Sequence, residues 1–233
     1  FDDDTMIFAG WSRGYKSGGF NARAALAEMW NPYDDMRVDS YELGVKSSFW
    51  DNRARLNATA YYEDIKDNQL QFNDDAFNII LANAGDARVY GLEIEGAVRP
   101  VAGLDLTAGF GLADTRLDKA INPISDPSGK DERASRHFEY SPKYNWNASA
   151  RYSFPPVQIG NPVMRVDYRG SSPIGFNSSK ADDKIVGQGS YGVVDARLEL
   201  NAVRTDSLGG SFDFALIGRN LTDKSYRVGG YAF

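Results

Sequence analysis

Residues 144–154 read YNWNASARYSF, and every second side chain in this segment is apolar. Successive side chains of a β-strand point to opposite faces, so the segment predicts a strand with one apolar and one polar face. The apolar side combines alanines with aromatic residues, whereas the polar side carries Asn, Ser and Arg. Such a strand separates two very different environments.

The same alternation continues along the chain in both directions. No window of comparable length shows the 3.6-residue period of an amphipathic helix. The pattern therefore predicts an all-β chain of nine strands, at residues 4–13, 38–50, 53–72, 86–99, 104–117, 142–154, 161–175, 191–202 and 210–222.

The connections between these strands alternate in length. Four are short, at residues 50–53, 100–104, 155–161 and 204–210. Four are long and rich in Gly, Asn, Asp and Ser, at residues 14–37, 73–85, 118–141 and 176–190. Short turns at one end and long loops at the other indicate an antiparallel up-and-down meander, the layout of outer-membrane β-barrels.

Two features favour a transmembrane barrel over a soluble β-sandwich. Most predicted strands are long enough to cross a bilayer, which takes about 9 to 11 tilted residues. Their apolar faces mix alanines with aromatic residues near the strand ends, such as Trp146 and Phe154, where a soluble core would carry Val, Ile and Leu throughout. A soluble β-sandwich binding module remains the alternative fold, because alternation alone fits both.

Composition excludes several other classes of protein. The sequence of 233 residues contains no apolar stretch long enough for a membrane-spanning helix, and its mean hydropathy is -0.46. A net charge of -6 argues against a nucleic-acid partner. The absence of Cys and the single His, His137, remove thiolate and two-histidine metal sites. We expect no cofactor and no enzyme activity, because Glu93 and Glu95 have no nucleophile or oxyanion context.

Polar features of the predicted loops have plain interpretations. The pairs Asp34-Asp35 and Asp182-Asp183 match no calcium-loop spacing and are interpreted as solvated turn carboxylates. His137 is interpreted as an ordinary loop residue, with a lone ligand or a pH sensor as the alternative.

Four segments resemble the TonB-dependent outer-membrane receptors. They are SRGYKSGGFNAR at 12–23, DSYELGVKSSFWDNRARLNATAYYEDIKDNQLQF at 39–72, NAGDARVYGLEIEGAVRP at 83–100 and GRNLTDKSY at 218–226. The family has a barrel of about 22 strands with a plugged lumen. The resemblance implies that residues 1–233 form a partial barrel of about nine strands, the C-terminal part, without the plug domain, the early strands and the last strand.

The resemblance also implies a function and partners. It indicates energy-coupled nutrient import in the bacterial outer membrane, with a ferric siderophore as the first choice of cargo. Cobalamin, haem, another metal chelate or an oligosaccharide remain open. The implied partners are outer-membrane lipid and lipopolysaccharide, the protein's own plug domain, and the TonB complex acting through the absent N-terminal region. The alternative is a passive porin-like or adhesin barrel without energy coupling.

Two groups of residues are candidates for contact with a ligand or the lumen. The outer-loop candidates for ligand binding are Tyr15, Phe20, Trp30, Tyr33, Phe77, Arg136, His137, Phe138, Tyr140 and Phe176. The lumen-facing candidates are Glu42, Lys46, Arg53, Arg55, Glu93, Glu95, Arg151 and Arg197, with paired or solvated wall residues as the alternative interpretation. We expect replacement of Trp30 or Phe138 by Ala to weaken ligand binding and to leave assembly intact.

Overall fold

A computed structural model describes residues 4–21, 32–73, 79–121, 129–205 and 210–231. The elements are β1 (Thr5–Lys16), β2 (Gly19–Phe20), β3 (Pro32–Tyr33), β4 (Met36–Phe49), β5 (Ala54–Lys66), β6 (Gln69–Asn73), β7 (Ile79–Asn83), β8 (Ala87–Val98), β9 (Leu104–Leu117), β10 (Tyr144–Ser153), β11 (Asn161–Ser171), α1 (Lys180–Val186), β12 (Tyr191–Thr205) and β13 (Gly210–Gly218). No helix in the described ranges is long and apolar enough to cross a membrane.

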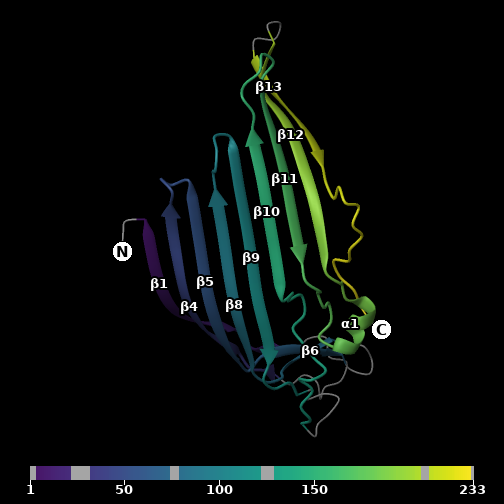
Figure 1. The fold of residues 1–233 in the computed structure, drawn as a ribbon. Coiled ribbons are helices and arrows are strands. Elements are labelled where there is room, and N and C mark those ends of the chain that lie inside the picture. The colour runs from purple at the N-terminus through teal and green to yellow at the C-terminus, as the bar shows by residue number, and fades with distance from the viewer. Residues whose placement is uncertain (1–3, 22–31, 74–78, 122–128, 206–209, 232–233) are drawn as a thin grey trace.

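Nine of these strands form one antiparallel sheet. Its order is β1-β4-β5-β8-β9-β10-β11-β12-β13. The order of these strands in the sheet is therefore the same as their order along the chain. Short turns join them at the upper end of Figure 1, and the long connections with β6 and α1 lie at the lower end. The predicted all-β meander of nine strands is confirmed, as an open sheet with β1 and β13 at its edges.

One predicted strand is divided in two. The sequence predicts a single strand over residues 53–72, but β5 ends at Lys66 and β6 pairs only with β7 in a separate hairpin. The break falls at Asp67, whose φ of 55° lies in the left-handed region and turns the chain out of the ladder. The predicted loop 73–85 therefore contains β7, which completes this hairpin.

A short helix occupies part of the predicted loop 176–190. The hydroxyl of Ser179 accepts the N–H of Asp182 at the start of α1, and two acidic residues stand in its first turn. Both features stabilise a helix N-terminus, because they satisfy free N–H groups and complement the helix dipole. Seven residues are too few to show a helical period in the sequence.

Some strand ends also differ from the prediction. β12 continues to Thr205 across a register shift between Leu200 and Val203. Ala202 has a φ of 55° at this shift and donates its N–H to the carboxylate of Asp213, so the bulge preserves pairing beyond it. β11 ends at Ser171 and β13 at Gly218, each four residues earlier than predicted.

The register places apolar side chains of all nine strands on one face. Directly paired residues of an antiparallel sheet point the same way. Leu43 pairs with Ala60, which pairs with Leu92, which pairs with Leu112. Such residues are open to the surroundings, as Leu43 at 59% exposure shows. A continuous exposed apolar face of this kind is what lipid contact requires.

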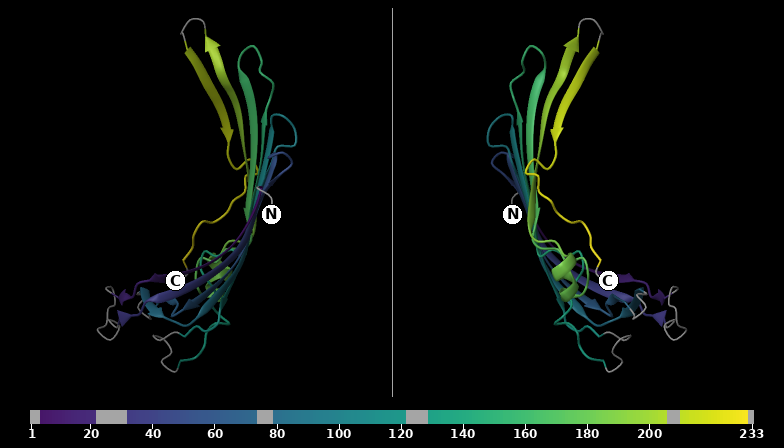
Figure 2. Two further views of the ribbon diagram at one scale, coloured as in Figure 1. Left: turned by 90° about the vertical axis from the view of Figure 1, so that its left-hand side faces the viewer. Right: turned by 90° about the vertical axis from the view of Figure 1, so that its right-hand side faces the viewer.

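The opposite face is polar and concave. Figure 2 shows the sheet curved in profile, with α1 on its concave side. Phe138, in a loop bonded to the α1 region, packs together with Tyr61 against the buried cluster of Ile65, Ala87 and Val89 in the sheet. Tyr61 is paired with Glu42 and so shares its face. The polar side chains therefore lie on the concave surface and the apolar ones on the convex surface.

Candidate functional site

Hydrogen bonds and a small apolar core join the long connections to one another. The side-chain amide of Gln69 donates to the carbonyls of Ser17 and Asp34, at 3.1 and 2.9 Å. Leu70, Phe72, Ala84 and Ala120 form the buried core of this region. The β6–β7 hairpin is therefore fixed to the first long connection and to the segment after β9.

A second group of contacts holds residues 136–140 against the segment around α1. The guanidinium of Arg136 bonds Glu132 at 2.7 Å and Ser178 at 3.0 Å, and its centre lies 4.7 Å from the ring centroid of Phe72. The ring of Tyr140 packs on that of Phe176, with centroids 5.4 Å apart. Arg136 and Phe176 thus serve as the framework of the loops.

Asp183 joins several segments of this second group through its two carboxylate oxygens. Its Oδ1 accepts the N–H groups of Phe176 and Asn177, both at 2.9 Å. Its Oδ2 contacts the imidazole of His137, whose Nε2 also lies 2.8 Å from the carbonyl of Asn177. The side chain of Asp183 is only 9% exposed, so the interpretation of this residue as a solvated turn carboxylate is wrong.

A cavity of 810 Å³ lies beside this group. Its lining includes His137, Phe138, Lys143, Tyr144, Lys184 and Gln188. Lys184, the imidazole of His137 and the amide of Gln188 supply donors, and the ring of Phe138 supplies apolar contact. Lys143 adds a positive charge, although its Nζ also lies 3.5 Å from the carboxylate of Asp114. Asp183 also lines the cavity, but backbone N–H groups engage its Oδ1. The arrangement suits a polar ligand of net negative charge with flat or apolar parts.

Burial raises the pKa of the Glu139 carboxyl, which lies at the edge of the same loop group. The nearby charge of Asp183 raises this pKa further, while a hydrogen bond from Ser178 and the charges of His137 and Arg136 lower it. Desolvation is the largest of these effects, because a half-buried carboxylate loses much of its hydration.

Half of the outer-loop candidates come together in the structure. Arg136, His137, Phe138, Tyr140 and Phe176 all belong to the loop group around α1. His137 and Phe138 line the cavity, whereas Phe176 is 5% exposed and packs under Tyr140. Because Phe138 packs against the sheet, its replacement by Ala would disturb the loop framework as well as any ligand contact.

The remaining outer-loop candidates lie elsewhere. Tyr15 is in β1 and is 77% exposed, on the same face as Trp11. Phe20 and Tyr33 belong to the small β2–β3 sheet. Trp30 and Phe77 fall outside the described residues.

Seven of the eight lumen-facing candidates share the concave polar face. They are Glu42, Lys46, Arg55, Glu93, Glu95, Arg151 and Arg197. Arg53 instead lies at the turn before β5, where its guanidinium donates to the carbonyls of Arg99 and Pro100. Whether these side chains meet a ligand or another domain stays a prediction.

Some charged side chains of the concave face form ion pairs, and others do not. Arg151 lies 3.6 Å from Asp105, and Arg197 lies 2.5 Å from Glu199. In the described part of the chain, no cation is within ion-pair distance of Glu42, Glu93 or Glu95. The strands β4 and β8 therefore present carboxylates that are free to meet a basic surface.

Sequence reasoning missed the other polar residues of the cavity. Lys184 and Gln188 lie in the predicted loop 176–190, where Phe176 is the one candidate, and Lys143 lies in the predicted strand 142–154. One signal was present: Ser179 followed three residues later by Asp182 is a helix-capping pattern, which would have placed α1 and Lys184. Among the described residues, no group of three or more His, Cys, Asp or Glu side chains could hold a metal ion.

Comparisons with known proteins agree with this architecture. Residues 1–221 match the family model described as TonB dependent receptor-like, beta-barrel. The ferric yersiniabactin uptake receptor FyuA from Yersinia pestis is similar in structure, with a TM-score of 0.76 and 22% identity over 100% of this chain and 32% of its own. The siderophore receptor PiuA from Acinetobacter baumannii has a TM-score of 0.70 and 20% identity, over 97% of this chain and 30% of its own.

The family model identifies the family, and the similar structures agree in the fold. The chain spans about a third of the length of either similar structure. The family consists of receptors of the bacterial outer membrane rather than of enzymes. An open nine-stranded sheet, apolar outside and polar inside, is a partial wall of such a barrel. This chain belongs to the TonB-dependent receptor family and forms part of its outer-membrane β-barrel.

Proposed function

We propose that the receptor containing this chain imports a ferric siderophore across the outer membrane, with energy supplied by the TonB complex. The observation that carries the proposal is the family match over residues 1–221. Two of the similar structures are a ferric yersiniabactin uptake receptor and a siderophore receptor, which favours this cargo. The cavity at the long-loop end supports it, because Lys143 and Lys184 suit an anionic chelate.

The two faces of the sheet have different roles in import. The convex apolar face holds the wall in lipid, and the concave polar face lines the path from the long loops inward. A ligand captured beside His137 and Lys184 lies at the entrance of this path. The unpaired carboxylates Glu93 and Glu95 lie further along the wall, where the plug domain of the receptor would contact them. TonB would act on that plug.

Uptake of radioactive iron by cells tests the proposal. The full-length receptor is expressed in cells that lack it, and uptake is measured with ferric siderophores, in the presence and absence of TonB. We expect saturable uptake that requires both proteins. Uptake that persists without TonB and does not saturate would instead identify a passive porin-like barrel. Growth on cobalamin, haem or an oligosaccharide without any siderophore uptake would overturn the choice of cargo.

Side-chain variants test whether the cavity takes part in ligand binding. Lys143→Gln and Lys184→Gln each remove one charge from the lining, and we expect weaker binding of an anionic chelate. Lys130→Gln is the matched control, because Lys130 is an exposed lysine of the preceding loop that does not line this cavity. Equal affinity in all four proteins would remove the cavity from the ligand site.

A further inference from the structure

Residues 219–231, the crossing segment, leave the edge of the sheet and run to the loop group around α1. β13 ends at Gly218, which pairs with Ala196, although β12 extends beyond this pair to Tyr191. Figure 2 shows the chain after β13, in yellow, passing toward α1 on the concave side of the sheet. The crossing segment contains most of the GRNLTDKSY sequence, which pairing within the wall does not explain.

A tight turn redirects the chain at the start of the crossing segment. The N–H of Asn220 donates to the carboxylate of Asp195 at 2.7 Å, and the N–H of Leu221 donates to the carbonyl of Val194 at 2.8 Å. The side chain of Asn220 closes the turn, because its Oδ1 accepts the N–H of Lys224 at 2.9 Å. Asn220 has a φ of 50°, a left-handed conformation that Asn tolerates better than most residues. The sequence around Asn220 therefore turns the chain out of the ladder.

Two stacked rings place the next part of the crossing segment on the concave face. The rings of Tyr226 and Tyr191 have centroids 4.5 Å apart, and their planes are 7° from parallel. Tyr191 shares the concave face of β12 with Asp195 and Arg197, because every second residue of a strand points the same way. The stack therefore directs the next residue, Arg227, toward the loop group around α1.

Arg227 binds the C-terminal end of α1. Its Nη1 donates to the carbonyls of Ile185 and Gly187, at 2.8 and 3.2 Å. Its backbone N–H donates to Oε1 of Gln188 at 2.6 Å. The last carbonyls of a helix lack partners within the helix, and a guanidinium beside them also complements the helix dipole. Arg227 therefore fixes the end of α1 to the crossing segment.

The bond between Arg227 and Gln188 determines the orientation of the Gln188 amide. A backbone N–H can only donate, so the atom that meets it is the side-chain oxygen. The nitrogen Nε2 donates one N–H to the carbonyl of Gly189 at 2.8 Å, and within the described residues its other N–H makes no hydrogen bond. Gln188 and Lys184 both line the cavity. This part of the lining therefore offers donors to a bound molecule.

We propose that Arg227 is a positioning residue of the ligand site. It holds the end of α1, and with it Lys184, and it turns the amide of Gln188 so that Nε2 donates to an anionic group of the ligand. Arg227 does not itself line the cavity, so it acts through Gln188 and Gly187, which do. This role rests on the proposed import function, since it concerns the same cavity.

Binding of two ferric chelates to the full-length receptor tests this role. The probes are a triply anionic ferric tris-catecholate and an uncharged ferric tris-hydroxamate. We expect Arg227→Ala to weaken binding of the tris-catecholate about tenfold, the scale of one lost hydrogen bond to a charged group, and to affect the tris-hydroxamate much less. Arg227→Lys should recover most of the affinity, because an ammonium also binds helix carbonyls. Unchanged binding in Arg227→Ala, or a receptor that binds only the uncharged chelate, would overturn the proposal.

Gln188→Glu separates the orientation of the amide from packing of the loops. Glutamate keeps an oxygen for the N–H of Arg227, but it replaces the donor Nε2 by a carboxylate oxygen. We expect much weaker binding of the tris-catecholate and nearly unchanged binding of the tris-hydroxamate. An equal loss for both chelates would contradict the role of Nε2 as a donor to the ligand.

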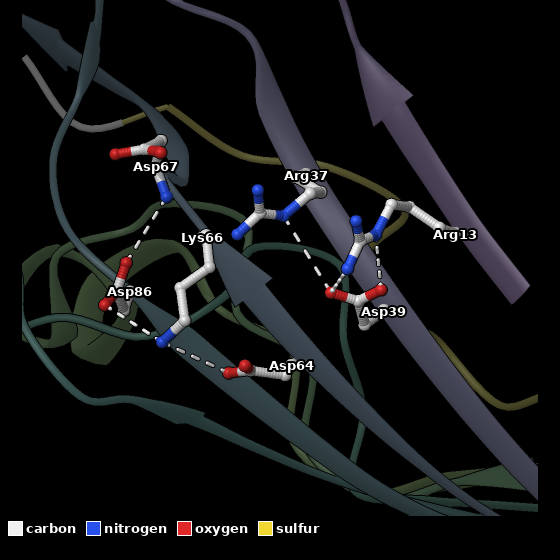
Figure 3. A network of polar contacts seen from close by, with 7 residues as sticks. All are labelled: Arg13, Arg37, Asp39, Asp64, Lys66, Asp67 and Asp86. Carbon is white, nitrogen blue, oxygen red and sulfur yellow. Dashed lines mark hydrogen bonds and ion pairs between the residues drawn. The ribbon is translucent and has the colours of Figure 1, made fainter. Parts of the chain in front are cut away.

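Arg13→Gln is the matched control. The guanidinium of Arg13 also makes two hydrogen bonds, to the carboxylate of Asp39 at 2.7 and 3.0 Å (Figure 3). Asp39 lies on the same, convex face of β4 as Leu43, away from the cavity. We expect the control to bind both chelates as the original protein does. A loss equal to that of Arg227→Ala would reflect a general defect of the barrel and would overturn the proposal.

Hydrogen exchange of the receptor without ligand distinguishes failure of this role from failure of the import function. The N–H groups of Gly187 and Gln188 bind the carbonyls of Asp183 and Ile174, both at 2.9 Å. We expect faster exchange at these two amides in Arg227→Ala and not in the control. Unchanged exchange would overturn the positioning role whatever the cargo. Faster exchange in a receptor that binds neither chelate would support the positioning role and overturn the siderophore as cargo.

Discussion

The carbonyl group of Lys119 lies directly against Gly85. A Cβ at Gly85 would stand 2.2 Å from the Lys119 oxygen, and the φ of Gly85 is 135°, where L residues are strained. The carbonyl of Gly85 also accepts the N–H of Asn68 at 2.6 Å. Gly85 therefore connects the segment before β8 to the turn before β6 and to the segment after β9.

Gly85→Ala should loosen the long loops without removing the wall. The strained backbone alone costs about 1–3 kcal/mol, and the clash with Lys119 adds to it. We expect faster proteolysis in the long loops and weaker ligand binding, with normal heat-modifiable mobility of the folded barrel on gels. Gly189→Ala is the control, because a Cβ there meets no atom within 4 Å. Equal protease resistance of the two variants would contradict this role for Gly85.

Adjacent residues of β8 should respond oppositely to the same substitution. Ile94→Arg places a charge on the convex face, where an arginine near the middle of the bilayer costs about 2–4 kcal/mol. Glu93→Arg places it on the concave polar face and should leave the free energy of unfolding nearly unchanged. Reversible unfolding of the receptor from lipid vesicles measures both. Similar losses in the two variants would show that the faces are wrongly assigned.

Tyr140→Ala should weaken ligand binding about fivefold, the scale of one aromatic contact. Tyr140 is 55% exposed, so its ring can reach a ligand, while Phe176 beneath it holds the loop. Tyr140→Phe retains the ring and should bind nearly as tightly as the original protein. Quenching of intrinsic fluorescence by a ferric siderophore gives the affinities. If the Ala variant binds as well as the Phe variant, the ring of Tyr140 is not in the ligand site.

Glu139 should make the loop group around α1 more stable in mild acid. Burial raises the pKa of this carboxyl above its ordinary 4.5, so folding favours the protonated form. Its favourable effect is complete below the unfolded pKa and is lost as the pH rises through the raised, folded value. Glu139→Gln should therefore increase protection of residues 174–188 at pH 7 and remove this part of the pH dependence.

Hydrogen exchange, corrected for the intrinsic effect of pH, measures that protection. Asp182→Asn serves as a control, because it changes a carboxyl of the same region, in the first turn of α1. Lower protection in Glu139→Gln at pH 7 would show that the ionised carboxylate stabilises the loops instead.

The wall could be predicted from the sequence because lipid imposes strict alternation. The apolar residues of YNWNASARYSF that belong to β10 all lie on the convex face, and the strand ends within one residue of the pattern. The loops obey no such rule. The DNQLQF segment keeps a strand-like sequence after Asp67, yet a left-handed φ at that residue removes it from the ladder.

The candidate site was only partly predictable for a related reason. Aromatic and basic residues in long loops marked the region, and five of ten outer-loop candidates do meet there. The role of Asp183 depends on a contact with His137 from a distant loop, and Lys184 depends on a helix of seven residues. Neither relationship leaves a periodic trace in the sequence.

The separation of the β6–β7 hairpin from the main sheet has an evolutionary consequence. Because the chain leaves the ladder at Asp67 and rejoins it at Ala87, residues between these points set no pairing of the wall. Insertions, deletions and substitutions in the hairpin can accumulate without shifting β5 against β8. The sequence and length of this hairpin can thus change while the pairing of the barrel strands stays the same.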